Sequence, residues 1–225
     1  MKKKEIKSNK TKKPWPTKAA MEQVYALKLW GNNKTDFYSG EGSHHPKIVN
    51  PYVDTIITFL TSFKEPLVVC DLGCGDFNVG KEFVKYTHKY IAVDIVSDLI
   101  ARNKTKFTAD NLEFYCLDIA IDDLPQGDCA LVRQVLQHLS NTEIQNIIKK
   151  LANFKYLILT EHLPEGDFIP NKDIISGQGI RRKKQSGVDI LASPFNFKVQ
   201  EVKRLIGITL PNSKGIIVTT LYTIF

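Results

Sequence analysis

The spacing of apolar and polar residues first predicts two helices near the start of the chain. Residues 17–30 are expected to form a helix with Thr17 as its N-cap and one apolar face (Ala20, Val24 and Leu27). Residues 31–49 are polar and rich in glycine, so we expect a loop there. A second helix is expected to open at Asn50 with Pro51 in its first turn, and apolar residues at helical spacing form its buried face (Val53, Ile56, Ile57 and Leu60).

From Leu67 onward, short apolar runs alternate with helical segments. The runs cover residues 67–72, 90–95, 112–119, 129–132 and 155–160, and two further strand-like runs cover 197–206 and 215–225. Near-continuous apolar runs are typical of parallel strands that are covered on both faces. The alternation predicts an α/β fold, a doubly wound and mostly parallel seven-stranded sheet that follows an N-terminal helical and lid segment.

Two of the intervening segments are expected to be helices. One covers about residues 78–88. The other begins with a capping box, S-x-x-E, at Ser140 and Glu143, and its buried stripe follows (Ile144, Ile147, Ile148 and Leu151). We divide the chain into a basic flexible tail over 1–16, helices and a lid loop over 17–64, and the sheet domain over 65–225.

Composition places the chain among ordinary folded proteins. Of its 225 residues, 43% are hydrophobic and 24% are charged. No apolar run approaches the roughly 18 residues of a membrane-spanning helix, and no apolar stretch of a secretory signal follows the basic start. The four cysteines lie mostly in apolar runs without paired spacing, so we expect a cytoplasmic protein with neither a disulfide framework nor a metal site.

The net charge of +7 is concentrated at the start of the chain. Residues 1–13 hold seven lysines and one glutamate, which leaves the rest close to neutral. This pattern predicts a solvated tail, and the alternative is an arm that contacts RNA, a membrane or an acidic partner. A second basic cluster, Arg181–Lys184, is expected to be an exposed loop, with an anion site for substrate as the alternative.

The strongest chemical signal follows the first predicted strand. That strand ends in Asp71, and Gly73 and Gly75 come next, as in a turn that lets backbone N–H groups approach a ligand closely. Asp94 ends the second strand, 23 residues beyond Asp71, where an acid can accept both ribose hydroxyls of a nucleoside.

Two cofactor classes use this arrangement. A dinucleotide site requires G-x-G-x-x-G, but the third glycine position is Asn78 here, and a pyrophosphate would lie close to Asp71 and Asp76. Two carboxylates favour a cation instead. S-adenosylmethionine carries a sulfonium and an ammonium group, so the electrostatics favour this methyl donor over NAD.

Further candidates follow the third and fourth strands. Asp118 can accept a hydrogen bond from an adenine amino group and Ile119 can cover the ring. Ile95, beside Asp94, is a further cofactor-binding candidate. The segment R-Q-V-L-Q-H-L, which begins at Arg133, would line the other side of the pocket.

These motifs, in this order and at about this spacing, resemble the class I S-adenosylmethionine-dependent methyltransferases. The resemblance covers about residues 65–162 and is extended by the strand pair at the C-terminus. It implies that Asp71, Gly73 and Gly75 surround the methionine part of the cofactor. It also implies that Asp94 holds the ribose, that Asp118 and Ile119 hold the adenine, and that Arg133 lies beside the cofactor.

A narrower resemblance is to a bacterial group of methyltransferases with no assigned substrate. It rests on D-L-G-C-G-D-F-N, V-L-Q-H-L-S-N and the later string D-I-x-x-G…D-I…P-F-N. This chain departs from the group in Arg182–Gly187, which resembles a local insertion. It departs from the wider family at Phe77, where a third glycine is frequent.

The segment Ser39–Ser43 is expected to be either a lid with hinges at Gly40 and Gly42 or a plain surface loop. Trp30 and Tyr38 flank it, and we expect them to pack rather than to stack on a substrate. If the acceptor must lose a proton, the candidate bases are His138, Glu161 and His162. His44 and His45 are further candidates in the lid segment, although we expect them, like His88, to lie at the surface.

Absent motifs narrow the expected acceptor. No N-P-P-Y-like tetrapeptide follows the fourth strand, no Pro-Cys pair exists, and no set of acids typical of metal-dependent catechol enzymes is visible. We therefore expect O- or N-methylation of a small molecule such as a metabolite, a sugar or a natural-product intermediate. The alternatives are an RNA or protein methyltransferase that uses the basic tail, and a non-catalytic protein that binds the cofactor.

Overall fold

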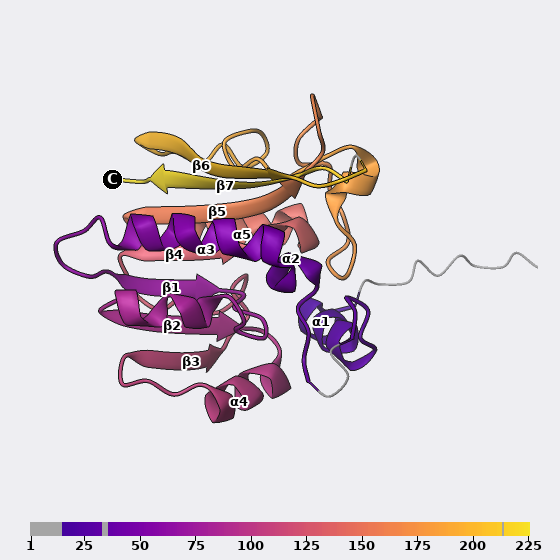
Figure 1. Ribbon diagram of the computed structural model, residues 1–225. Helices are drawn as coiled ribbons and strands as arrows, with labels where there is room; N and C mark the ends of the chain where they lie inside the picture. The colour runs from indigo at the N-terminus through magenta and orange to yellow at the C-terminus, as the bar shows by residue number, and fades with distance from the viewer. Residues whose placement is uncertain (1–14, 33–35, 213) are drawn as a thin grey trace, which may run out of the picture.

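The computed structural model describes residues 15–32, 36–212 and 214–225 (Figure 1). Its centre is a seven-stranded sheet in the order β3-β2-β1-β4-β5-β7-β6. Strands β1 to β5 run parallel to one another, while β7 runs antiparallel to β5 and β6. The predicted fold class is confirmed. The strands are β1 (Val68–Leu72), β2 (Lys89–Asp94), β3 (Leu112–Cys116), β4 (Cys129–Arg133), β5 (Tyr156–Leu163), β6 (Glu201–Thr209) and β7 (Ile216–Thr223).

Helices cover both faces of the sheet. Helix α3 (Pro46–Leu60) lies on one face and α5 (Asn141–Leu151) on the other (Figure 1). Because successive side chains of a strand point to opposite faces, Val69 packs with the α3 side and Cys70 packs with the α5 side. Helix α4 (Ser97–Lys106) follows β2. Burial on both faces explains why the central strands are apolar almost throughout.

Helix α5 forms as its sequence predicts. The Ser140 hydroxyl accepts a hydrogen bond from the Glu143 backbone, and the Glu143 carboxylate accepts one from the backbone of Ser140, so the capping box is complete. All four residues of the predicted apolar stripe are buried (Ile144, Ile147, Ile148 and Leu151).

The N-terminal helices differ from the prediction. Helix α1 (Thr17–Ala26) ends earlier than residue 30, and Thr17 does not cap it, since its hydroxyl donates to the Glu143 carboxylate instead. The expected loop over 31–49 contains α2 (Glu41–His44), and α3 begins at Pro46 rather than at Asn50. His45 caps α3 through its Nδ1 atom, so the helix starts a turn before Pro51.

Two other expectations were wrong. The helix over 78–88 is replaced by two 3₁₀ turns, η1 (Gly80–Glu82) and η2 (Val84–Tyr86). A side chain at Gly80 would collide with Phe77 and Asp71, so the chain passes close to the pocket here. Residues Arg181–Lys184 form the 3₁₀ turn η4, and Arg181 is only 1% exposed, so this cluster is not simply an exposed loop.

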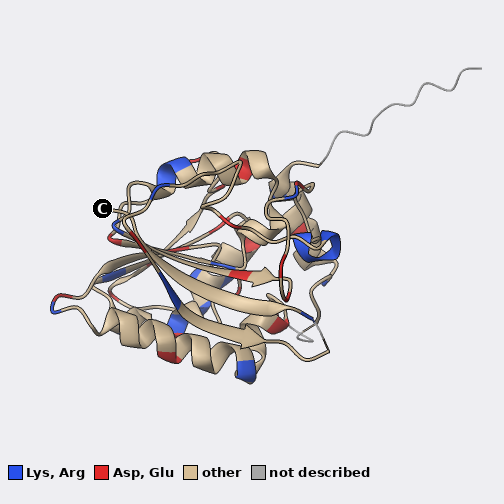
Figure 2. Cartoon of the chain, turned by 90° about the horizontal axis from the view of Figure 1, so that it is seen from above, with Lys and Arg blue, Asp and Glu red and all other residues tan. Residues whose placement is uncertain are grey.

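Segments that carry lysine or arginine and segments that carry aspartate or glutamate are both spread over the cartoon in the view from above (Figure 2). The lysine-rich segment 1–13, predicted to be a tail, lies outside the described residues. Among the residues that are described, no helix is both long enough and apolar enough to cross a membrane.

Candidate functional site

A cavity of about 430 Å³ opens at the carboxyl ends of β1, β2 and β4, beneath α1 and α2. This edge of a doubly wound sheet is where such folds bind ligands, and the volume lies in the range of small-molecule sites. All eight residues predicted to bind cofactor line this cavity: Asp71, Gly73, Gly75, Asp94, Ile95, Asp118, Ile119 and Arg133. Of the three predicted catalytic residues, His138 lines this cavity, whereas Glu161 and His162 do not.

The two glycines after β1 form a tight turn. Gly73 has φ = 90° and Gly75 has φ = 56°, values that side chains of L-residues rarely adopt. A side chain at Gly73 would also collide with Val135, and one at Gly75 would collide with Ser39. Both positions therefore require glycine, and the backbone is left open to the cavity.

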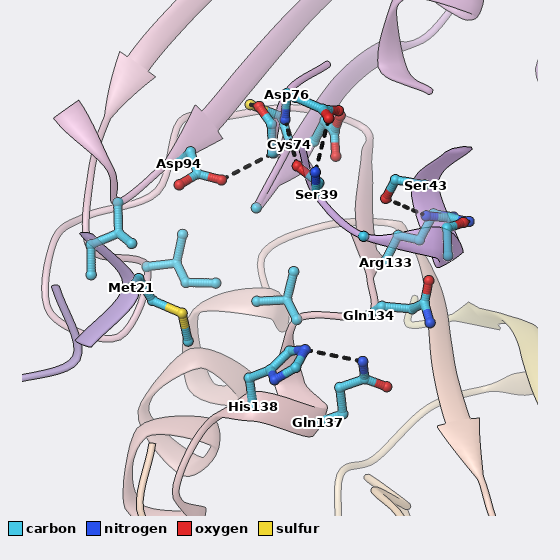
Figure 3. A pocket seen from close by; sticks show the side chains of 18 of the residues that line it. Met21, Ser39, Ser43, Cys74, Asp76, Asp94, Arg133, Gln134, Gln137 and His138 are labelled. Carbon is cyan, nitrogen blue, oxygen red and sulfur yellow. Dashed lines mark hydrogen bonds between the residues drawn. The ribbon is translucent and has the colours of Figure 1, made fainter. Parts of the chain in front are cut away.

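Asp94 fixes this turn from the end of β2. Its Oδ2 atom accepts a hydrogen bond from the Gly75 backbone N–H at 3.0 Å (Figure 3). Its Oδ1 atom accepts one from the Val96 backbone N–H at 3.0 Å. Burial raises the pKa of Asp94, and these backbone donors partly oppose the rise. The carboxylate is thus held at the wall of the cavity with its orientation set by the backbone.

Asp71 lies deeper, at the end of β1. The Tyr90 hydroxyl donates a hydrogen bond to its Oδ2 atom at 2.9 Å. Burial raises the pKa of Asp71 to about 7, although Tyr90 and the positive charge of Arg133 both oppose the rise. This carboxyl group therefore gains or loses a proton near neutral pH.

Arg133, at the end of β4, links the sheet to the N-terminal segment. Its guanidinium group lies 4.7 Å from the ring centroid of Tyr52 and donates to the Gly42 carbonyl and, at 3.2 Å, to the Ser43 hydroxyl. Its buried Nε atom has no hydrogen-bond partner among the described residues. Burial lowers the pKa of Arg133, and the nearby Asp71 opposes this.

The predicted lid segment is folded against the glycine turn through Asp76. The Asp76 carboxylate accepts a hydrogen bond from the Ser39 backbone at 2.9 Å and contacts His44 Nε2 at 2.6 Å. The Asp76 backbone in turn donates to the Ser39 hydroxyl at 2.8 Å. Gly40 (φ = 84°) precedes α2. The lid segment thus closes one side of the cavity rather than projecting from the surface.

The opposite end of the cavity has a different lining. Trp30 and His138 lie with ring centroids 5.1 Å apart, and Gln137 Nε2 lies 3.2 Å from His138 Nε2 (Figure 3). Gln178 belongs to the loop region between β5 and β6. Burial lowers the pKa of His138 to about 4, so its ring is neutral at pH 7. Neutral amides and rings therefore dominate here.

Glu161 and His162 do not line the cavity. Glu161 is 3% exposed, and neither carboxyl oxygen has a hydrogen-bond partner among the described residues. Burial raises the pKa of Glu161 to about 8, which the charge of Arg181 partly opposes. His162 Nε2 donates to the Lys214 carbonyl at 2.5 Å. Of the predicted bases, the structure brings His138 to the cavity, whereas His45 and His88 are exposed.

Several lining residues escaped the sequence analysis. Tyr25 and Met21 of α1 face the cavity, as do Gln178 and Ile180. Their segments lie far from the glycine turn in the chain and carry no local motif. Gln134 has a backbone φ of 55°, which is uncommon outside glycine, and its side chain lies against Gly42. This unusual backbone conformation became visible only in the structure.

Comparison with known proteins agrees with this geometry. Residues 69–154 match a family described as "Methyltransferase domain". The N-methyltransferase NodS from Bradyrhizobium japonicum WM9, solved with S-adenosyl-L-homocysteine, is similar in fold, with a TM-score of 0.66 and 12% identity over 90% of this chain and 97% of that one. Magnesium protoporphyrin IX methyltransferase from Synechocystis PCC 6803, solved with S-adenosylmethionine, gives a TM-score of 0.59 and 17% identity over 94% and 99% of the two chains.

The chain spans less than half the length of a curated relative that it matches. Ribosomal RNA small subunit methyltransferase A of Mycoplasma capricolum is 28% identical over 122 residues, which are 54% of this chain and 45% of that protein. The fold and the matched domain define the class: the chain carries a class I S-adenosylmethionine-dependent methyltransferase domain. S-adenosylmethionine is the cofactor of this class, and the open glycine turn and acid-rich wall fit a cationic nucleoside.

Proposed function

We propose that this chain transfers a methyl group from S-adenosylmethionine to an oxygen or nitrogen atom of a small-molecule acceptor. The proposal rests on one cavity with two different ends. We assign the cofactor to the acidic, glycine-lined end (the cofactor end) and the acceptor to the end of neutral amides and rings (the acceptor end). When bound, the cofactor supplies an electrophilic methyl group on its sulfonium. The chain's own residues align the two molecules and exclude water.

The charge of the lining supports this class of acceptor. Among the described residues that line the cavity, six are acids (Glu41, Asp71, Asp76, Asp94, Asp118 and Glu143), against a single arginine, Arg133. An excess of carboxylates attracts a cationic cofactor and repels phosphate groups. An uncharged acceptor or an amine therefore suits the cavity better than a polyanion.

Each end of the cavity has proposed roles. Asp71, Gly73 and Gly75 surround the methionine part of the cofactor. Asp94 and Ile95 hold the ribose side, and the adenine lies between Asp118 and Ile119. We assign Arg133 to the methionine carboxylate, because its unpartnered Nε atom is a buried donor beside the glycine turn.

His138 is our candidate catalytic residue. Its ring is neutral at pH 7 and lies on the cavity wall beside Trp30, so it can contact the acceptor. Its Nε2 atom, which lies 3.2 Å from Gln137 Nε2 in this structure, can receive a proton when the acceptor takes the place of the Gln137 amide. Glu161 and His162 have no such access, and we propose that they support the turn that carries His138 from behind.

Cofactor binding is tested by calorimetric titration with S-adenosylmethionine and, separately, with NAD. Asp94→Asn removes the charge that faces the cavity, and Asp110→Asn, at an exposed position, is the matched control. We expect micromolar binding of the methyl donor to the wild type and to Asp110→Asn, and strong weakening in Asp94→Asn. Binding of NAD instead, or of neither ligand, would overturn the proposal.

RNA is a second candidate acceptor, favoured by the match to the ribosomal RNA enzyme and by the lysines of residues 1–13. Transfer of radiolabelled methyl groups to three fractions of a cell extract (small molecules, RNA and protein) separates the candidates. We expect label in the small-molecule fraction. Label in RNA that depends on residues 1–13 and falls steeply with salt would favour the second candidate.

A further inference from the structure

A loop segment between β5 and β6 lies against the turn that carries His138. We call residues 171–181 the strap. The Gly177 backbone N–H donates to the His138 carbonyl at 3.0 Å, and the Ser140 N–H donates to the Ser176 hydroxyl at 2.7 Å. Gln178 of the strap also donates to the Leu29 carbonyl at 2.9 Å. The strap therefore joins the segment after β4 to the N-terminal part of the chain.

Arg181 is the centre of this contact. Its Nη1 atom donates to the Leu136 carbonyl at 3.1 Å, and its Nη2 atom donates to the Leu139 carbonyl and to Asn141 Oδ1, each at 2.7 Å. At 1% exposed, it is among the largest fully buried side chains of the described residues. The Leu136 carbonyl also accepts the Leu139 N–H within the turn at 3.0 Å, and a cation close to the carbonyls at the end of a helical turn is favourable.

The turn held in this way is η3 (Leu136–His138), and it carries two residues of the cavity wall. Gln137 Oε1 accepts a hydrogen bond from the His162 N–H at 3.1 Å, so Gln137 Nε2 donates to His138 Nε2 at 3.2 Å. The other ring nitrogen, Nδ1, donates to the Gly177 carbonyl at 3.2 Å. These contacts select one tautomer of His138, with the proton on Nδ1.

We propose that Arg181 is a positioning residue for the acceptor: by holding the carbonyls of η3 it fixes Gln137 and His138 in one orientation at the cavity wall. The inference rests on the proposed function. It gives the strap a role at the cavity, because reacting groups must be held in place by the residues that pack behind them. Glu161 lies in the same buried region and senses the arginine's charge.

The test compares Arg181→Met and Arg181→Lys with Lys183→Met, which removes an exposed cation of the same turn. The ring nitrogens of ¹⁵N-labelled histidine are followed by NMR, and the signal of His138 is assigned with His138→Gln. Affinity for S-adenosyl-L-homocysteine is measured in parallel by calorimetry. Neither measurement requires the acceptor to be known.

In the wild type and in Lys183→Met we expect a single Nδ1-protonated tautomer for His138 and titration near pH 4. In Arg181→Met we expect mixed tautomers and a pKa nearer the ordinary value of 6.5, with affinity for S-adenosyl-L-homocysteine within about twofold. Arg181→Lys keeps the charge but cannot reach all the carbonyls, so partial recovery is expected.

An unchanged His138 signal in Arg181→Met would overturn the proposal. Failure of both arginine variants to fold would also overturn it, since an effect confined to folding is that of a purely structural arginine. If the wild type binds no S-adenosyl-L-homocysteine, the proposed function fails, whereas the NMR comparison still decides whether Arg181 orients His138.

Discussion

The two ends of the cavity are assembled in different ways. At the cofactor end, Gly73, Gly75 and Asp94 come from two adjacent parallel strands, and backbone hydrogen bonds hold them. At the acceptor end, Trp30, His138 and Gln178 come from three distant segments that meet only through side-chain contacts and the strap. The first end is set by the pairing of two neighbouring strands, and the second depends on the packing of segments that are distant in the chain.

The largest expected effect breaks the cofactor end. Gly73→Val should weaken binding of S-adenosylmethionine by about 100-fold or more, since it adds backbone strain and a collision with Val135. Calorimetry measures the loss. Gly179→Val is the control, because no atom lies near a side chain placed there. Equal binding by both variants would contradict the role given to the glycine turn.

Trp30→Leu tests the acceptor end. Methyl transfer to the labelled small-molecule fraction should fall by about tenfold, because a large aromatic surface beside His138 is lost. Affinity for S-adenosyl-L-homocysteine should stay within about twofold, which separates the two ends. A parallel fall in cofactor affinity would mean that the ends are not independent.

The charge of Asp71 gives the cofactor end a pH dependence. Burial raises its pKa to about 7, and the ionised form attracts the cationic cofactor. Affinity should therefore fall by up to about tenfold per pH unit below 7 and level off above it. Asp71→Asn should flatten this dependence in calorimetry at several pH values. A dependence that persists in Asp71→Asn would assign it to another group.

The smallest expected effect is on the stability of the fold and arises from the buried Glu161. The folded chain raises the pKa of Glu161 from 4.5 to about 8, so protonation stabilises the fold fully below about pH 4.5, and this contribution is lost as the pH rises toward 8. Glu161→Gln should thus gain melting temperature relative to the wild type between these values. Glu65→Gln, at an exposed site, should not, and identical pH profiles for all three proteins would contradict the buried-acid assignment.

How well the sequence predicts each part of the molecule depends on the same difference between residues that are close in the chain and residues that meet only in the fold. The strands and the capping box of α5 were predicted because each is set by residues close together in the chain. All eight predicted cofactor residues line the cavity because parallel strands bring their carboxyl ends to one edge of the sheet. The predicted helix over 78–88 was wrong, because close packing at Gly80 favours two short turns. Arg181 was predicted to lie at the surface, because charge alone indicates exposure.

The sequence by itself determined the α/β order of elements, the glycine turn and the acids at the strand ends, because parallel strands bring their carboxyl ends to one edge whatever surrounds them. Only the tertiary structure decided that His138 reaches the cavity, that Glu161 is buried outside it and that Arg181 is buried. Those outcomes depend on contacts between residues 25 or more positions apart in the chain, such as His138 with Gly177, Gln137 with His162, and Arg181 with Leu136. Burial and hydrogen bonding in the folded chain, rather than residue type, set the role of each of these groups.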